Sequence, residues 1–246
     1  MIKKFQLLTG LIILLSPLYT NAQHSKGMLS IAFKHVVDGA ALQLDSAVYK
    51  NALGQTFTVS KFKYYISNIQ LEKAGGKKIT VPGYFLINEE EEASKRLMLN
   101  SIPEGEYISM QFMIGIDSLH NCSGAQSGAL DPANGMFWAW NSGYVFLKLE
   151  GKAAASASPG KIFEYHIGGY TAPANCIRSI SLAFEKPLRI SRETTSSVTI
   201  KVNAAEVLRA PVTIDFSALS SVTDLHNATT IADNYTDMFS IATDEK

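Results

Sequence analysis

The sequence predicts an all-β protein, folded as a single antiparallel β-sandwich with long loops and a short C-terminal helix. Three observations support this fold class. Short runs rich in β-branched and aromatic residues recur along the chain. Turns rich in Gly, Asn and Pro separate these runs at regular spacing. Neither an internal repeat nor a break in composition divides the 246 residues into further domains.

The first 22 residues are expected to be a signal peptide that lies outside this domain. Lys3 and Lys4 begin the segment, residues 7–18 are mostly apolar, and Ala22 ends a small-residue cleavage pattern. The apolar run is short for a bilayer span, and no Cys follows it as a lipid anchor. We therefore expect a periplasmic or secreted protein, with a domain over residues 23–246 and a core of about 28–240.

Alternating apolar and polar residues predict a first strand over residues 29–35, with His35 on its apolar face. Further strands are expected over residues 41–45, 56–71, 79–81, 84–87, 107–116, 144–149, 163–167, 176–184, 188–190 and 197–202. Residues 204–208 indicate a helical turn, and residues 231–239 indicate the C-terminal helix. The acidic run at 89–92 is interpreted as a solvated segment. The long connection over residues 117–135 is of a kind that is usually functional or tied down.

Charge and motifs exclude several classes of function. The chain has 22 Lys and Arg against 22 Asp and Glu, and loss of Lys3 and Lys4 leaves 20 against 22, a net charge of about −2. This balance gives no reason to expect a nucleic acid or a membrane surface as partner. The sequence contains no nucleophile elbow, phosphate-binding glycine loop or zinc-hydrolase motif, so we do not expect an enzyme.

The only two cysteines, Cys122 and Cys176, both lie in turn-like contexts. Because an exported chain meets an oxidising compartment, we expect one disulfide between them. The alternative is a metal site with two thiolates, which requires reduced cysteines.

Both tryptophans, Trp138 and Trp140, lie between a turn and a predicted strand. One interpretation is that they plug one end of the core, since an indole has a large apolar area to bury. His35 and His166 each end a predicted strand, and a sandwich gathers its strand ends at two edges. Two imidazoles suit copper, zinc or iron, although the spacing alone favours two unrelated histidines that are satisfied locally.

Longer motifs surround these residues, at 33–35, 37–39, 63–68, 117–119, 123–126, 128–132, 135–144 and 165–169. Together these motifs resemble the MbnP-like family, the methanobactin-associated periplasmic copper-binding proteins and their relatives outside methanotrophs. The resemblance covers residues 29 to 239.

The resemblance implies a secreted β-rich protein that binds copper after a tryptophan is oxidised to kynurenine by a partner di-haem peroxidase of the MbnH type. Carried onto this chain, it makes Trp138 or Trp140 the modified residue and His35 and His166 the imidazole ligands. The chemistry is reasonable because an intact indole offers an N–H donor but no lone pair for a metal. Ring opening yields an aromatic amine and a ketone, which are both potential ligands.

Three hypotheses follow. The leading one is a non-enzymatic copper-binding protein. The second is a secreted recognition module with an aromatic platform for a sugar or peptide, and exposed indoles would favour it; the platform residues would be Trp138, Trp140, Tyr144 and Tyr170. The third is an enzyme that uses His166 as a base near Asp117.

Overall fold

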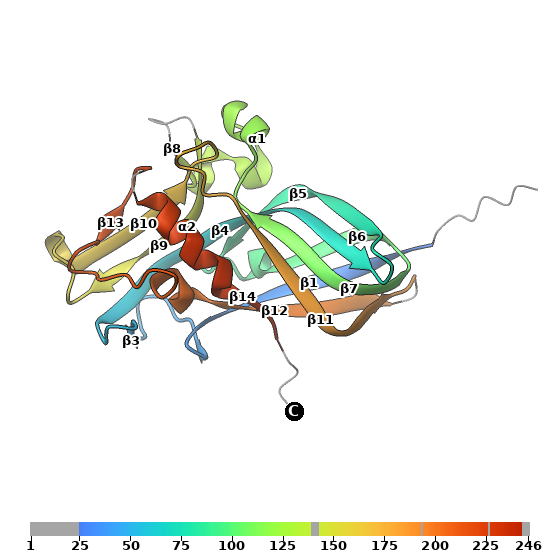
Figure 1. Ribbon diagram of the computed structural model, residues 1–246, viewed down its shortest axis with the longest axis horizontal. Coiled ribbons are helices and arrows are strands. Elements are labelled where there is room, and N and C mark those ends of the chain that lie inside the picture. The colour runs from blue at the N-terminus through green and yellow to red at the C-terminus, as the bar shows by residue number, and fades with distance from the viewer. Residues whose placement is uncertain (1–24, 139–142, 193, 226, 243–246) are drawn as a thin grey trace, which may run out of the picture.

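Two β-sheets pack face to face in the structure, a computed structural model that describes residues 25–138, 143–192, 194–225 and 227–242 (Figure 1). The predicted signal peptide and Trp140 lie outside these residues. A single cluster of buried residues fills the space between the sheets and draws on both of them. The sandwich predicted from the sequence is therefore present.

Five strands form the smaller sheet in the described part of the chain. Its central strand is β1 (Lys26–Val37), which pairs with its neighbours over most of its length. The other strands are β2 (Ala40–Ala41), β6 (Arg96–Pro103), β12 (Thr195–Asn203) and β14 (Phe239–Ile241).

The larger sheet has nine strands in the described residues and is built around β4 (Thr56–Lys73). The long strand β4 pairs antiparallel with four others, and β9 and β10 extend the sheet on one side. The remaining strands are β3 (Tyr49–Lys50), β5 (Lys78–Asn88), β7 (Gly105–Ile114), β8 (Phe137–Trp138), β9 (Gly143–Ala153), β10 (Ile162–Gly168), β11 (Arg178–Ile190) and β13 (Ser221–Val222).

The sheets are mixed, so the prediction of an antiparallel sandwich is only partly right. Strands β1 and β12 run parallel, and so do β10 and β13. Parallel neighbours need a long crossover between them, and almost the whole larger sheet lies between β1 and β12 in the sequence. Alternation of apolar residues reports the buried face of a strand but not the direction of its partner.

Two short α-helices accompany the sheets among the described residues. Helix α1 (Ser118–Cys122) stands at one edge of the sandwich within the long connection, and α2 (Ala228–Asn234) lies along its side (Figure 1). A 3₁₀ helix over Tyr235–Met238 continues α2, which confirms the predicted C-terminal helix, and another occupies Ala204–Leu208. No described helix combines the length and the apolar character needed to cross a membrane.

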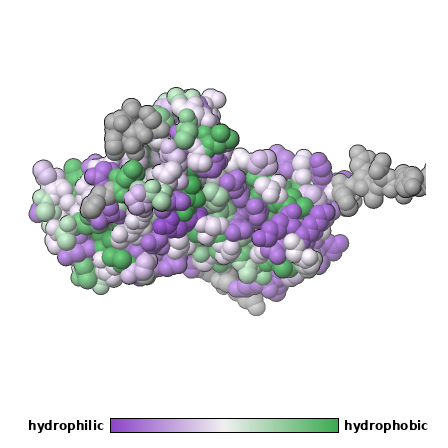
Figure 2. Space-filling view, turned by 45° about the horizontal axis from the view of Figure 1, so that its top comes forward, coloured by the Kyte–Doolittle hydropathy of each residue, from purple (hydrophilic) through white to green (hydrophobic). Residues whose placement is uncertain are grey.

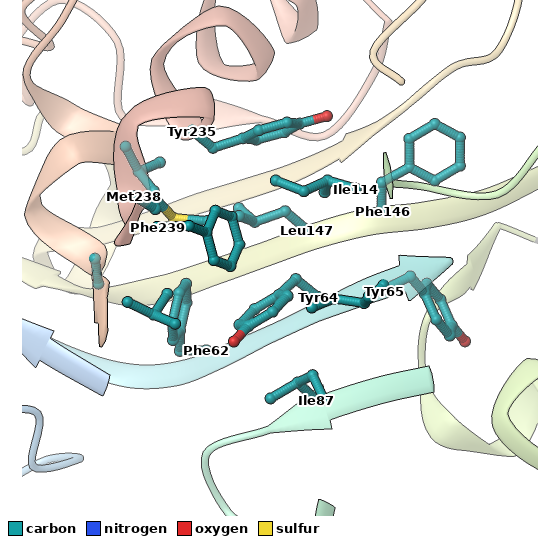
Figure 3. Packing of buried hydrophobic residues seen from close by; sticks show 14 of the residues in the cluster. Phe62, Tyr64, Tyr65, Ile87, Ile114, Phe146, Leu147, Tyr235, Met238 and Phe239 are labelled. Carbon is teal, nitrogen blue, oxygen red and sulfur yellow. The ribbon is translucent and has the colours of Figure 1, made fainter. Parts of the chain in front are cut away.

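The core is rich in aromatic rings that join the two sheets. Phe62 and Tyr64 of β4 lie close to Phe239 of the smaller sheet, and the ring centres of Tyr64 and Phe239 are 5.7 Å apart (Figure 3). By contrast, the face shown in Figure 2 carries hydrophilic residues with only small, separated hydrophobic groups. These rings thus join the smaller sheet to the inner surface of the larger sheet.

Candidate functional site

The long connection predicted to be functional or tied down is held against the outer surface of the larger sheet. The Tyr65 hydroxyl donates to the Ala129 carbonyl at 2.8 Å, and the Tyr144 hydroxyl donates to the Leu130 carbonyl at 2.8 Å. Further along, Lys148 donates to the Gly135 carbonyl at 2.7 Å. These bonds fix the loop that leads into Trp138.

Trp138 lies on β8, which forms a short hairpin with the start of β9. Its side chain is buried, with 7% exposed, against Gly168 at the end of β10. A β-carbon on Gly168 would lie 2.7 Å from Cζ3 of Trp138, so this close approach requires glycine. A cavity of about 180 Å³ adjoins the indole and is lined by Asn121, Tyr170 and neighbouring loop residues.

His166 lies on β10 in a cluster with two carboxylates. Its Nε2 atom is 2.8 Å from Oε1 of Glu150, and one ligating atom each from Glu150, Glu164 and His166 lie within 4.8 Å of one another. Lys61 reaches the other Glu150 oxygen at 3.1 Å. The hydrogen bond from His166, helped by Lys61, lowers the pKa of Glu150 to about 2.

Trp138 packs against the strand that carries His166, but from the opposite face of the larger sheet. His166 is level with Lys148 of β9, whereas Gly168 is level with Val145, because the register of β10 shifts just before Gly168. Alternate residues of a strand point to the same side, so this shift by three residues of β9 reverses the face. The indole that covers Gly168 therefore lies on the other side of the sheet from the imidazole cluster.

His35 lies on β1 of the smaller sheet and packs against the inner face of the larger sheet, so the expected meeting of the two imidazoles does not occur. It pairs with Tyr64, whose hydroxyl is 2.8 Å from Nε2 of His35. In the sheet register Tyr64 is level with Leu147, while His166 is level with Lys148, one residue further along β9. Because successive residues alternate sides, Tyr64 faces the core and His166 faces outward.

Both ring nitrogens of His35 have partners within the protein. Nδ1 lies 2.5 Å from Oε2 of Glu89, on the acidic run expected to be solvated, and Lys95 lies 3.3 Å from the same oxygen. Burial lowers the pKa of His35, although Glu89 opposes this. A neutral imidazole that donates to Glu89 and accepts from Tyr64 satisfies all three groups, so His35 is a structural residue.

The expected disulfide is wrong for this structure, because both cysteines are free. Cys122 is exposed at the end of α1, where its Sγ lies 3.2 Å from the Tyr170 hydroxyl. Cys176 is buried, with Sγ 3.7 Å from the Ala174 carbonyl oxygen. One thiol thus faces solvent while the other is directed into the protein, and no shared thiolate site forms either.

A third group of polar side chains was not expected from the sequence. Tyr84 of β5 contacts both Asp117 and His120, at the start of α1. The sequence indicates only a loop hydrogen bond for His120 and only a strand position for Tyr84. The Asp-x-x-His spacing was the one available signal, since Asp117 caps the helix and its side chain accepts from the His120 amide.

Comparison with known proteins agrees with this architecture. The family model described as MbnP matches residues 26–228, which is most of the chain. The chain belongs to the MbnP family. Among solved structures, MbnP from Methylosinus trichosporium superposes with a TM-score of 0.58 at 15% identity, over 88% of this chain and 98% of that one. No curated protein matches the sequence.

In this MbnP family member, the match to that solved structure establishes the fold rather than the chemistry, because the two sequences share so few residues. The site has to be argued from its own side chains. His166, Glu150 and Glu164 share the outer face of the larger sheet, and Trp138 is buried at the end of the same strand β10.

Proposed function

We propose that this protein is a non-enzymatic copper-binding protein of the periplasm or extracellular space, with a metal ligand derived from an oxidised tryptophan. The observation that supports this most is the position of Trp138, which is buried against Gly168 on β10, the strand that also carries His166. Family membership supports the same function.

The residues present fit a copper ion in part before any modification. His166 offers an imidazole, which suits copper, and Glu150 and Glu164 offer oxygen atoms within 4.8 Å. Lys61 already holds one Glu150 oxygen, so a cation must compete with an ammonium group. An additional neutral nitrogen ligand would strengthen the set, and intact indole cannot supply one.

Oxidation of Trp138 to kynurenine would create such a nitrogen donor beside β10. Hydrogen peroxide is the proposed oxidant: it is reduced to water while the C2–C3 bond of the indole breaks, and the C2 carbon then leaves as formate. The opened ring carries an aromatic amine and a ketone, and a di-haem peroxidase of the MbnH type is the proposed partner that performs the oxidation. The short hairpin and the contact with Gly168 hold the side chain in place. We propose Trp138 as the modified residue because it is buried against the strand that carries His166; Trp140 lies outside the described residues.

An aromatic recognition platform is less well supported. Such a platform needs aromatic faces open to solvent, and both Trp138 and Tyr144 are buried. An enzyme with His166 as base near Asp117 is also less well supported, because the two residues have different partners. His166 contacts Glu150, whereas Asp117 contacts Tyr84 and His120.

The test is co-expression with the peroxidase, followed by mass spectrometry of the peptide that contains both tryptophans and by metal analysis. We expect kynurenine at Trp138 and about one copper per chain, with both lost in Trp138→Phe. His166→Ala should keep the modification and lose most of the copper, whereas His35→Gln should keep both. An unmodified peptide together with a copper-free protein would remove the proposal.

A further inference from the structure

The three polar side chains of the unexpected group bring their ligating atoms together at one point on the surface. The Tyr84 hydroxyl donates to Oδ2 of Asp117 and lies 2.6 Å from Nδ1 of His120. The same Nδ1 lies 3.0 Å and 3.2 Å from the two oxygens of Asp117. We propose that Tyr84, Asp117 and His120 form a separate metal site for a hard, oxidised transition-metal ion, either Fe(III) or Cu(II).

The spacing of these atoms is that of ligands around an ion. In an octahedral shell with ligand distances of about 2.0–2.1 Å, neighbouring donor atoms lie about 3 Å apart. The separations of 2.6 to 3.2 Å around Nδ1 of His120 are close to this value. Only a small outward movement of the side chains is needed to admit an ion.

The ligand set selects the class of ion. A phenolate and a carboxylate are hard anionic oxygen donors, and an imidazole nitrogen suits iron and copper. A soft Cu(I) ion would favour sulfur, and no sulfur atom belongs to this group. The site therefore differs in chemistry from the proposed tryptophan-derived site and does not rest on it.

Metal binding at this group must release a proton. Burial and the carboxylate of Asp117 raise the pKa of Tyr84, so the phenol is protonated while no ion is bound. Although burial opposes it, hydrogen bonds from Tyr84 and His120 lower the pKa of Asp117, which is already ionised. An arriving ion forms a bond to the phenolate oxygen, and the phenol proton leaves to solvent.

The group is both accessible and rigidly held. The side chains of His120 and Asp117 are 35% and 31% exposed, which leaves room for water or an anion to complete the shell. The Asp117 side chain also accepts from the His120 amide, and the next residue, Asn121, accepts from the Tyr144 amide at 3.0 Å. Helix α1 is thereby fixed relative to β9, which favours a preformed site.

The experiment uses the purified full chain, stripped of metal, with Fe(III)-nitrilotriacetate and Cu(II) added in separate arms. Metal–phenolate bonds give a visible charge-transfer band and resonance-enhanced tyrosine vibrations. We expect this signature in at least one arm, at one ion per chain, with affinity that rises with pH. The two arms show which of the two ions the site prefers.

Matched variants locate the signal. Tyr84→Phe should abolish the band while it keeps the ring packing against His120, whose ring centre is 4.5 Å away. Asp117→Asn, which retains a helix-capping oxygen, should weaken binding by at least about 10-fold. Tyr170→Phe, a phenol with a different partner in Cys122, should leave the band unchanged.

The outcomes are separable from those of the proposed function. His166→Ala should leave the charge-transfer band intact even though it removes the other site. The proposal is overturned if neither ion produces the band in folded wild-type protein, or if Tyr84→Phe retains it. A band that disappears in Tyr170→Phe instead would also overturn it, because the ligand would then be a different phenol.

Discussion

Gly168 is the residue on which the tryptophan hairpin rests. A β-carbon there would lie 2.4 Å from the Tyr144 carbonyl oxygen and 2.7 Å from the Trp138 ring. Gly168→Ala should therefore lower the free energy of unfolding by roughly 1–3 kcal/mol, as overpacking does, and shift the Trp138 fluorescence to the red. Denaturant titration and emission spectra measure the two effects.

Gly54→Ala is the control for this substitution. Gly54 has a φ of +73°, and nothing lies within 4 Å of the point that a β-carbon would occupy, so alanine there should cost about 1 kcal/mol in backbone strain. It should leave the tryptophan emission unchanged. Equal spectra for Gly168→Ala and wild type would contradict the contact between Trp138 and β10.

His35 makes stability depend on pH. Its pKa is lowered by burial, so below about pH 6.5 the unfolded chain binds a proton that the folded chain does not. The free energy of unfolding should then fall by up to about 1.4 kcal/mol per pH unit until the folded-state pKa is reached. The lowered pKa of Glu89 adds a second loss at more acidic pH, below its unfolded value.

His35→Gln isolates the imidazole contribution to this pH dependence. Glutamine can still donate a hydrogen bond to Glu89 but does not titrate, so its stability profile should be flatter between about pH 6.5 and 5 than that of wild type. Urea titrations at several pH values provide the comparison. If the free energy of unfolding depends on pH in the same way in both proteins, the pKa of His35 is not lowered by folding.

At the scale of elements, the two thiols differ in exposure: one lies at the end of α1 and the other in the segment before β11. Cys122 is exposed, whereas Cys176 is buried and its thiol pKa is raised by burial to about 12. Native protein should react with a thiol reagent at one cysteine, and denatured protein at two. Because only the thiolate reacts, Cys176 should label at least about 100-fold more slowly than Cys122.

Mass mapping of the labelled peptides identifies the reactive cysteine, and Cys122→Ser provides the control. That variant should show almost no reaction until it is denatured. Protein without any reactive thiol after denaturation in the absence of reductant would demonstrate a disulfide, contrary to the structure.

The positions of the strands were easier to predict than the strands with which they pair. Strands such as β4, β7, β9 and β12 follow from period-two alternation and β-branched residues, which are local properties. Strand β6 was missed, since its central residues Leu97 and Leu99 alternate over too short a run beside a predicted turn. The parallel pairing of β1 with β12 depends on contacts between distant segments, which alternation does not encode.

The candidate site was only half predictable for the same reason. His35 and His166 both end apolar-alternating segments, and the sequence shows neither which sheet each joins nor which face each occupies. Glu89 looked like part of a solvated run, yet it is the partner that a buried imidazole requires. Glu164 and His166, two residues apart on one strand, were the local signal that pointed to a shared face.

At the scale of the whole molecule, one core serves both sheets, and this determines how the protein unfolds. Phe239 of β14 packs its ring 5.7 Å from Tyr64 and 5.1 Å from Phe112 of the larger sheet, so it joins the two layers. Trp138 lies on the β8–β9 hairpin of the larger sheet, packed against Gly168 of β10. If the two sheets unfold together, a substitution that weakens the packing between them must also shift the unfolding transition reported by Trp138.

Phe239→Ala should therefore lower the free energy of unfolding by about 3–5 kcal/mol, the usual cost of removing a buried aromatic ring. Far-UV circular dichroism, which reports both sheets, and tryptophan fluorescence should shift to lower denaturant by the same amount. Leu119→Ala, at a side chain that is 71% exposed, should change stability by no more than about 0.5 kcal/mol. Transitions that separate in Phe239→Ala would show that the larger sheet keeps its fold, and the tryptophan hairpin its place, without the smaller sheet.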